Sequence, residues 1–237
     1  MRNYIQNYLE NNDNIILLHN DVWPYKHERI IDLGLSEFLT IQYAYGLTLQ
    51  GYKVLIYGIS GFILNKILYF VNDYNIRNVT LLNAGAGFTY YPSSIAHYNY
   101  NDIQIARMMK MQIYVPYKTN QLDSILNNNS FNYLRLGFDR YESLKSNIKR
   151  ENKIPIIAYG WLYYYLSKLF TNVISIVDLN IQYDYNNGIV VEDHFKEGGL
   201  LENVKNSKAW IGIKEKKEYS YKEFLSYVVK EIQQFWI

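Results

Sequence analysis

Short apolar runs alternate with amphipathic segments along this chain, and the alternation limits the folds open to it more than any other feature. The runs 15–18, 54–57, 79–82 and 112–115 are partly β-branched and bounded by Gly, Pro, Asn or Asp, as buried parallel strands are. The segments 36–49, 62–74, 101–109 and 120–127 carry apolar residues at helical spacing. Strands and helices in alternation predict an α/β sheet covered on both faces.

The second half of the chain repeats this pattern on a smaller scale. A polar stretch at 127–130 and a charged stretch at 139–153 separate the halves. Beyond them we expect strands at 154–158, 173–177, 188–191 and 210–213, and helices at 161–170 and 221–235. The sequence therefore predicts two consecutive α/β domains with mostly parallel sheets covered by helices, over residues 1–145 and 150–237.

Composition narrows the classes of partner. The 237 residues are 49% hydrophobic, enough for a substantial core, and 24 basic against 22 acidic residues give a net charge of +2. Dispersed charges of both signs argue against a nucleic-acid partner. No segment has the roughly 20 apolar residues that span a bilayer, no secretory signal opens the chain, and cysteine is absent. We expect a soluble cytoplasmic protein with small-molecule or protein partners and no membrane contact.

An ordered series of motifs runs through both halves. It comprises Arg29-x-x-Asp-x-Gly-x-x-Glu37, Ala44-x-Gly-Leu-x-x-x-Gly51, His97-x-x-x-Asn-Asp-Ile-x-x-x-Arg107, Asn132-Tyr-Leu-Arg-Leu-Gly137 and Val190-Val-Glu-Asp-His194 before Gly198-Gly199. This series resembles the second half of the transketolase family, enzymes that depend on thiamine diphosphate. The resemblance implies a pyrimidine-binding domain followed by a transketolase C-terminal domain.

Glu37 carries the functional interpretation. Taken alone, it is an acidic residue in the first turn of a helix, with Ser36 as a candidate N-cap. The resemblance implies that Glu37 is catalytic and bonds N1′ of the cofactor's aminopyrimidine. A carboxyl group in an apolar pocket has a raised pKa and can share a proton with a ring nitrogen at neutral pH.

Three further positions receive roles from the resemblance. Phe62 would stack on the aminopyrimidine, and Asn65, one helical turn later, would face the same site and contact the cofactor. His97, in a loop before a helix, would face the carbonyl and hydroxyl groups of a sugar substrate and take part in catalysis. Taken alone, a phenylalanine at position 62 is usually an ordinary core residue, and a lone histidine such as His97 is usually structural.

The chain departs from the family where substrate would be anchored. Ser93 occupies the substrate-binding position of an acidic residue that holds a donor-sugar hydroxyl, and Phe138 replaces an arginine that often anchors phosphate. Gly85 stands where full-length transketolases tend to place a phosphate-binding histidine. Arg140 is a possible compensating cation or an ordinary surface residue. These changes suggest a substrate other than a simple sugar phosphate.

The metal-binding half of the site has no counterpart in the sequence. The family holds Mg²⁺ and the diphosphate with a Gly-Asp-Gly motif on a preceding domain, and no Gly-Asp-Gly occurs here. Glu192, Asp193 and His194 are contiguous on a predicted strand, so their side chains cannot converge on one ion. We assign no metal ligand to this chain and expect a separate partner subunit, in an α2β2 assembly, to carry the diphosphate and Mg²⁺.

Three hypotheses follow. The first is one subunit of a split transketolase-like transferase of carbohydrate metabolism, moving a two-carbon ketol unit from a ketose to an aldehyde. The second is the β subunit of a 2-oxoacid dehydrogenase E1-type enzyme, which the stretch from His97 to Arg107 disfavours. The third is a catalytically inert homologue that serves as a scaffold or regulatory partner.

Overall fold

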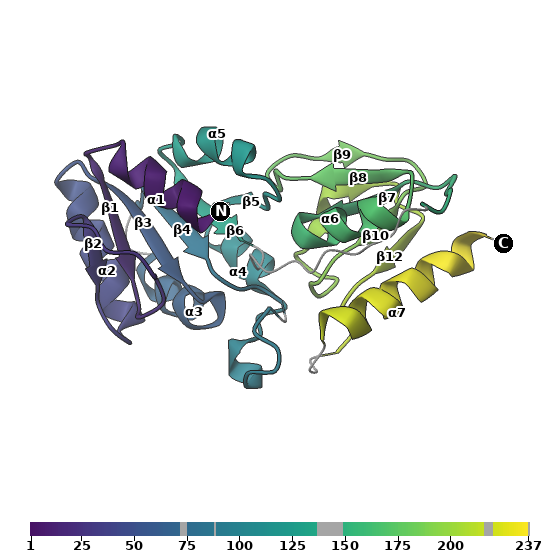
Figure 1. Cartoon of the computed structure of the whole chain (residues 1–237), viewed down its shortest axis with the longest axis horizontal. Helices are drawn as coiled ribbons and strands as arrows, with labels where there is room; N and C mark the ends of the chain where they lie inside the picture. Colours follow the sequence, from purple (N-terminus) through teal and green to yellow (C-terminus); the bar gives the residue numbers. More distant parts are fainter. Residues whose placement is uncertain (72–74, 88, 137–148, 216–219, 237) are drawn as a thin grey trace.

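The computed structural model divides into two lobes that lie side by side (Figure 1). It describes residues 1–71, 75–87, 89–136, 149–215 and 220–236, and of residues 69–71, 95 and 236 only the backbone. We call residues 1–136 the first lobe and residues 149–236 the second. Among the described residues, no helix is both long and apolar enough to cross a membrane.

The first lobe is built on a six-stranded sheet in which every pairing is parallel, in the order β2-β1-β3-β4-β6-β5. Its strands are β1 (Ile15–His19), β2 (Ile30–Asp32), β3 (Lys53–Gly58), β4 (Val79–Asn83), β5 (Gln112–Tyr114) and β6 (Phe131–Arg135). Its helices are α1 (Arg2–Glu10), α2 (Glu37–Leu49), α3 (Ser60–Val71), α4 (Asp102–Met108) and α5 (Leu122–Leu126), with 3₁₀ turns η1 (Ile95–His97) and η2 (Thr119–Gln121).

Helices cover both faces of this sheet because its strands are apolar on both sides. Along β1, Ile16 and Leu18 pack into the core beneath α2, α3 and α4, whereas Ile15 and Leu17 pack into the core beneath α1 and α5. The side chains alternate because successive residues of a strand point to opposite faces. A parallel sheet of this kind is buried on both sides.

The second lobe has a parallel four-stranded sheet in the order β12-β10-β7-β8. Its elements are β7 (Ile156–Tyr159), α6 (Gly160–Leu169), β8 (Val173–Ile176), β10 (Ile189–Val191), η3 (Leu200–Asn203), β12 (Ala209–Ile211), α7 (Tyr221–Gln233) and η4 (Gln234–Trp236). A two-stranded parallel ribbon joins β9 (Tyr183–Asp184) to β11 (Val204–Lys205). Helix α7 starts with a capping box in which Ser220 and Glu223 bond each other's backbone N–H.

The predicted α/β class with mostly parallel sheets is confirmed, while some short elements were missed. The sequence analysis assigned no element to α1, β2, β6 or the β9–β11 ribbon. β2 is an edge strand of three residues, none of them fully buried, so it lacks a continuous buried run. The predicted boundary between residues 145 and 150 stays a proposal, since residues 137–148 lie outside the described part.

The seam between the lobes is formed largely by the carboxyl ends of strands from both sheets. Beyond β5, the backbone of Val115 donates to Val177 at 2.7 Å, and Leu179 donates back to Ile113 at 2.9 Å. One apolar core runs across the seam, because Tyr159 and Val190 of the second lobe belong to the same cluster as Ile113. The carboxyl edge of the first sheet is therefore packed and hydrogen-bonded against the second lobe at this seam.

Candidate functional site

The strand order singles out one place on the first sheet. β1 lies between β2 and β3, so the chain leaves β1 toward one side and returns through β3 on the other. In open parallel sheets, the crevice outside the carboxyl ends of strands at such a switch point is where ligands bind. Asn20 follows β1, Ser60 follows β3, and Glu37 begins the helix after β2. The elements carrying the predicted residues Glu37 and Phe62 thus start at this edge.

Glu37 is the first residue of α2 and is half-buried. Within the described part of the chain, its carboxylate has no hydrogen-bond or ion-pair partner. Ser36 does occupy the N-cap position, but the expectation that its hydroxyl caps the helix is wrong: Oγ donates to the carbonyl of Leu33 instead. The Glu37 carboxylate is consequently left for a ligand or for solvent.

Phe62 and His97 are brought together. Phe62 lies in the first turn of α3 and His97 ends η1, and their rings meet edge to face with centroids 5.2 Å apart. Tyr90 joins them, its ring 5.9 Å from that of His97. The Nδ1 atom of His97 lies 3.0 Å from Ser94 Oγ, and both Phe62 and His97 are half-buried. The result is an aromatic wall with an imidazole on it.

Among the described residues, the side chains of Asn65 and Ser93 make no hydrogen bond to the three rings of this wall. Asn65 is exposed, and its amide donates back to the carbonyl of Gly61 on its own helix at 3.0 Å. Ser93 is exposed as well, and its backbone N–H donates to Tyr90. Phe138 and Arg140 lie outside the described residues. The roles of Asn65 and Ser93 stay predictions.

The structure explains why position 85 is a glycine, which the sequence did not reveal. A Cβ atom built on Gly85 would lie 2.2 Å from Cε2 of Tyr90, so the tyrosine ring fills the space that a side chain would need. The phosphate-binding histidine expected at this position in the family would have to displace that ring. Burial raises the pKa of Tyr90, whose hydroxyl is thus neutral at pH 7.

Asn83 organises this part of the site and was missed by the sequence analysis. It ends β4 and is fully buried, and its Oδ1 accepts the N–H of Ser60 at 3.0 Å and of Gly85 at 3.1 Å. The hydroxyl of Ser60 then donates to the carbonyl of Gly85. These bonds fasten the start of α3, which carries Phe62, to the loop that carries Tyr90. A polar residue ending a buried strand at the carboxyl edge is the signal that could have revealed it.

The residues of the motif from His97 to Arg107 lie in two different places. His97 lies at the site beside Phe62, whereas Asp102 and Arg107 lie in the seam between the lobes. Arg107 donates to the carbonyls of Gly198 at 2.8 Å and Gly199 at 3.2 Å in the second lobe. Asp102 accepts two hydrogen bonds from the guanidinium of Arg135, Nε to Oδ2 at 2.7 Å and Nη2 to Oδ1 at 3.2 Å. Arg135 in turn bonds the second lobe through Asp193.

Asp193 completes a buried charge triad, which we define as Asp102, Arg135 and Asp193. Its Oδ1 accepts from Arg135 at 2.6 Å and its Oδ2 from the indole of Trp161 at 2.8 Å. All three charged side chains are at most 3% exposed. Burial alone would lower the pKa of Arg135, but the two carboxylates hold it well above its ordinary value. The guanidinium thereby stays charged and ties the lobes together.

Glu192 and His194 are buried beside this triad. Glu192 accepts from the backbone of Leu200 and the indole of Trp210, each at 2.6 Å. Burial raises the pKa of Glu192 to about 8 in spite of these donors. The Nδ1 atom of His194 lies 2.6 Å from the carbonyl of Phe195. Among the described residues, no group of three or more His, Cys, Asp and Glu side chains is placed to hold a metal ion.

The residues at the edge fit one end of thiamine diphosphate and not the other. A free carboxylate at Glu37 and a half-buried ring at Phe62 are the groups needed to bond and stack on an aminopyrimidine. The diphosphate end needs a divalent cation, and the described residues offer no cluster to hold one. The described residues therefore supply groups for the pyrimidine end of such a site and none for its metal-bound end.

Solved structures resemble this chain in fold. A protein described as a split gene transketolase, in an inactive beta4 tetramer, matches with a TM-score of 0.69 and 16% identity over 97% of this chain and 95% of that one. A transketolase from Campylobacter jejuni matches at 0.74 and 14%, and one from Pichia stipitis, in complex with sedoheptulose-7-phosphate, at 0.68 and 13%. Those two matches cover 98% and 96% of this chain but only 46% and 43% of the transketolases. No family model and no curated protein matches the sequence.

Proposed function

We propose that this chain, which has the fold of the C-terminal section of a transketolase, is one subunit of a split transketolase-like enzyme. The enzyme would move a two-carbon ketol unit from a ketose to an aldehyde, using thiamine diphosphate held between this chain and a partner subunit. The observation that carries the proposal is the placement of Glu37, Phe62 and His97 around the carboxyl edge of one parallel sheet.

Each residue has a defined task in this proposal. Glu37 holds a proton at N1′ of the aminopyrimidine, because its carboxylate is free of partners within the described chain. Phe62 presents a ring face for stacking, worth on the order of 1 kcal/mol beyond burial. His97 directs its imidazole at the oxygen atoms of the sugar. The cofactor, when bound, supplies the electron sink for breaking a carbon–carbon bond.

The surface around Glu37 supports a partner subunit. Leu35 is 84% exposed, Phe38 46%, Leu39 47% and Tyr43 42%, all within or just before the first two turns of α2. A helix with apolar side chains on every side belongs in a buried setting. A partner covering this surface would enclose Glu37 and could bring the Mg²⁺ and diphosphate ligands that the described residues do not provide. An α2β2 assembly would create two such sites.

The Tyr90 ring packed against Gly85 supports the proposal that the substrate is not a typical transketolase substrate. Tyr90 offers a neutral hydroxyl where a cation would be needed to bind phosphate, and Ser93 offers a hydroxyl in place of a carboxylate. We therefore propose that the donor is not a simple sugar phosphate and is recognised through hydroxyl groups and aromatic contact.

The test is coexpression of this chain with a subunit that carries the Gly-Asp-Gly motif, followed by measurement of thiamine diphosphate binding and ketol transfer. Glu37→Gln should lower turnover by at least about 100-fold, since it removes a general acid–base group, while Glu28→Gln at an exposed loop position should leave turnover unchanged. Unchanged turnover in E37Q would refute the catalytic proposal. A stable complex that binds no cofactor would favour an inert scaffold.

A further inference from the structure

Helix α2 starts without the usual side-chain cap, although it carries Glu37 as its first residue. Ser36 makes no cap hydrogen bond to the helix backbone. A helix start of this kind normally depends on an N-cap side chain that bonds the N2 or N3 N–H group. Another set of contacts must therefore fix where α2 begins and in which direction Glu37 leaves the sheet.

Two side chains hold Gly34, the residue three positions before Glu37, from both sides. The Oδ1 atom of Asp32 accepts the N–H of Gly34 at 2.9 Å, and the Nδ2 atom of Asn20 donates to the carbonyl of Gly34 at 2.7 Å. Gly34 has φ +61°, a left-handed conformation that glycine adopts without strain. Both polar groups of one turn residue are thus fixed by side chains from the ends of β1 and β2.

The same two side chains tie this turn to the sheet and to the helix. Asp32 Oδ1 also accepts the N–H of Asp21 at 3.0 Å, which joins the ends of β1 and β2. Asn20 Nδ2 also donates to the hydroxyl of Thr40 at 2.9 Å, within the first turn of α2. Asn20 is only 4% exposed, so its amide is a rigid connection between β1 and α2.

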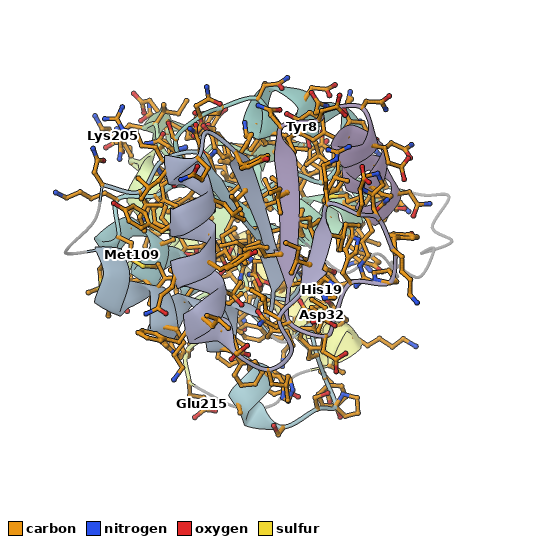
Figure 2. The ribbon with its side chains drawn as sticks, turned by 90° about the vertical axis from the view of Figure 1, so that its left-hand side faces the viewer. Tyr8, His19, Asp32, Met109, Lys205 and Glu215 are labelled. Carbon is orange, nitrogen blue, oxygen red and sulfur yellow. The ribbon has the colours of Figure 1, made fainter. Side chains whose placement is uncertain are left out.

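Electrostatics favour the bonds of Asp32. The backbone N–H groups of Gly34 and Asp21 lower the pKa of Asp32, so the group is a carboxylate at neutral pH and its bonds are charge-assisted. The His19 side chain lies beside it, with Nδ1 3.6 Å from Asp32 Oδ1 (Figure 2). Burial lowers the pKa of His19, so this imidazole is mostly neutral at pH 7 and does not draw the carboxylate away from the turn.

We infer that Asn20 and Asp32 are positioning residues, which set the start of α2 and thereby the place of the Glu37 carboxylate. The inference rests on the proposed function for the role of Glu37. Catalytic groups must be held within about 0.5 Å of the productive geometry by supporting hydrogen bonds. Asn20 and Asp32 provide that support from the sheet, in place of an N-cap.

The experiment compares Asn20→Ala and Asp32→Ala with Asp32→Asn, which keeps an acceptor oxygen. Asn132→Ala is the matched control: Asn132 is equally buried in the same sheet, but it bonds Thr80 and the carbonyl of Asn128 near the amino edge. Each variant is measured for thermal unfolding, for hydrogen exchange of residues 36–41, and for thiamine diphosphate affinity in the complex with the partner subunit.

N20A and D32A should raise exchange at residues 36–41 and weaken thiamine diphosphate binding, each by about tenfold, as the loss of one or two hydrogen bonds implies. D32N should fall between D32A and the wild type. N132A should lower the unfolding temperature as much as N20A while changing binding less than twofold. If N20A and D32A behave like N132A both in hydrogen exchange of residues 36–41 and in thiamine diphosphate affinity, the positioning role is wrong. If E37Q binds and turns over normally while N20A still raises the local exchange, the proposed function fails and the structural part of this inference stands.

Discussion

The two lobes each place a glutamate and a histidine at the carboxyl edge of a parallel sheet, with opposite outcomes. Glu37 and His97 are half-buried, and the Glu37 carboxylate has no partner in the described chain. Glu192 and His194 are fully buried, and both oxygens of Glu192 accept N–H groups. The two glutamates therefore differ: Glu37 lies at an open edge of the first lobe, and Glu192 lies in a closed joint of the second.

The difference shows that burial and hydrogen-bond partners decide whether a polar side chain can bind a ligand or only stabilises the fold. A polar group whose bonding capacity is met inside the chain has nothing left for a ligand, while an unmet one at an edge can bind. The buried charge triad holds the second lobe against the first, so the open edge keeps its shape. We expect changes in the closed joint to alter stability and changes at the open edge to alter binding.

The largest effect on stability is expected at Arg135. Replacing Arg135 with alanine leaves Asp102 and Asp193 buried without their cation, which should cost about 3–5 kcal/mol in the free energy of unfolding. Urea denaturation of the chain would measure this loss. Arg77→Ala, at an exposed position, should change the free energy of unfolding by less than about 0.5 kcal/mol. A loss below 1 kcal/mol for R135A would mean that the triad does not hold the lobes together.

The next effect is a pH dependence that comes from Glu192. Burial raises the pKa of Glu192 to about 8 in the folded chain, whereas the ordinary pKa of a glutamate is 4.5. Between pH 4.5 and 8 the folded chain therefore keeps a proton on Glu192 that the unfolded chain has released. This contribution to stability is complete below pH 4.5 and is lost as the pH rises to 8, with a slope of at most about 1.4 kcal/mol per pH unit. Glu192→Gln should remove it. Parallel curves for the two proteins, in unfolding measured from pH 5 to 8, would contradict the assignment.

The smallest effect on stability, with the clearest effect on assembly, is expected on the exposed surface of α2. Replacing Leu39 and Tyr43 with lysine should change the free energy of unfolding by less than about 0.5 kcal/mol, because both are already exposed. It should prevent the complex with the partner subunit, which light scattering after coexpression would reveal. Ile181→Lys, on the second lobe, is the matched exposed control. Normal assembly of the lysine variant would place the partner surface elsewhere.

The sequence predicted the elements that form by local pattern. Strands β1, β3 and β4 are short, buried and largely apolar, whereas only Ile113 of β5 is fully buried. All four strands lie where the alternation predicted them. The meeting of Phe62 and His97 follows from their positions after β3 and β4, since neighbouring parallel strands end at one edge. Helix α1 was not predicted, because it is short and fully buries only two hydrophobic side chains, Ile5 and Leu9, while Tyr4 and Tyr8 pack partly buried against the same core.

The contacts of the motif residues could not be predicted in the same way. Arg29 donates to the carbonyls of Leu9 and Asn12, near the amino edge of the sheet and away from Glu37. Arg107 reaches carbonyls 91 and 92 residues later in the chain. Such partners depend on which strands become neighbours and on how the lobes pack, and residue spacing carries no information about either.

The sequence by itself determined the α/β class and the residues that stand at the ends of the strands, because hydrophobic periodicity is a local property. Only the tertiary structure decided what those residues do. It paired Asp102 with Arg135 at the seam between the lobes and placed the Tyr90 ring against Gly85. It also brought the side chains of Asn20 and Asp32 to Gly34, just before α2. These outcomes depend on hydrogen bonds and close packing between distant segments, whose partners are fixed only when the sheet order and the seam between the lobes are formed.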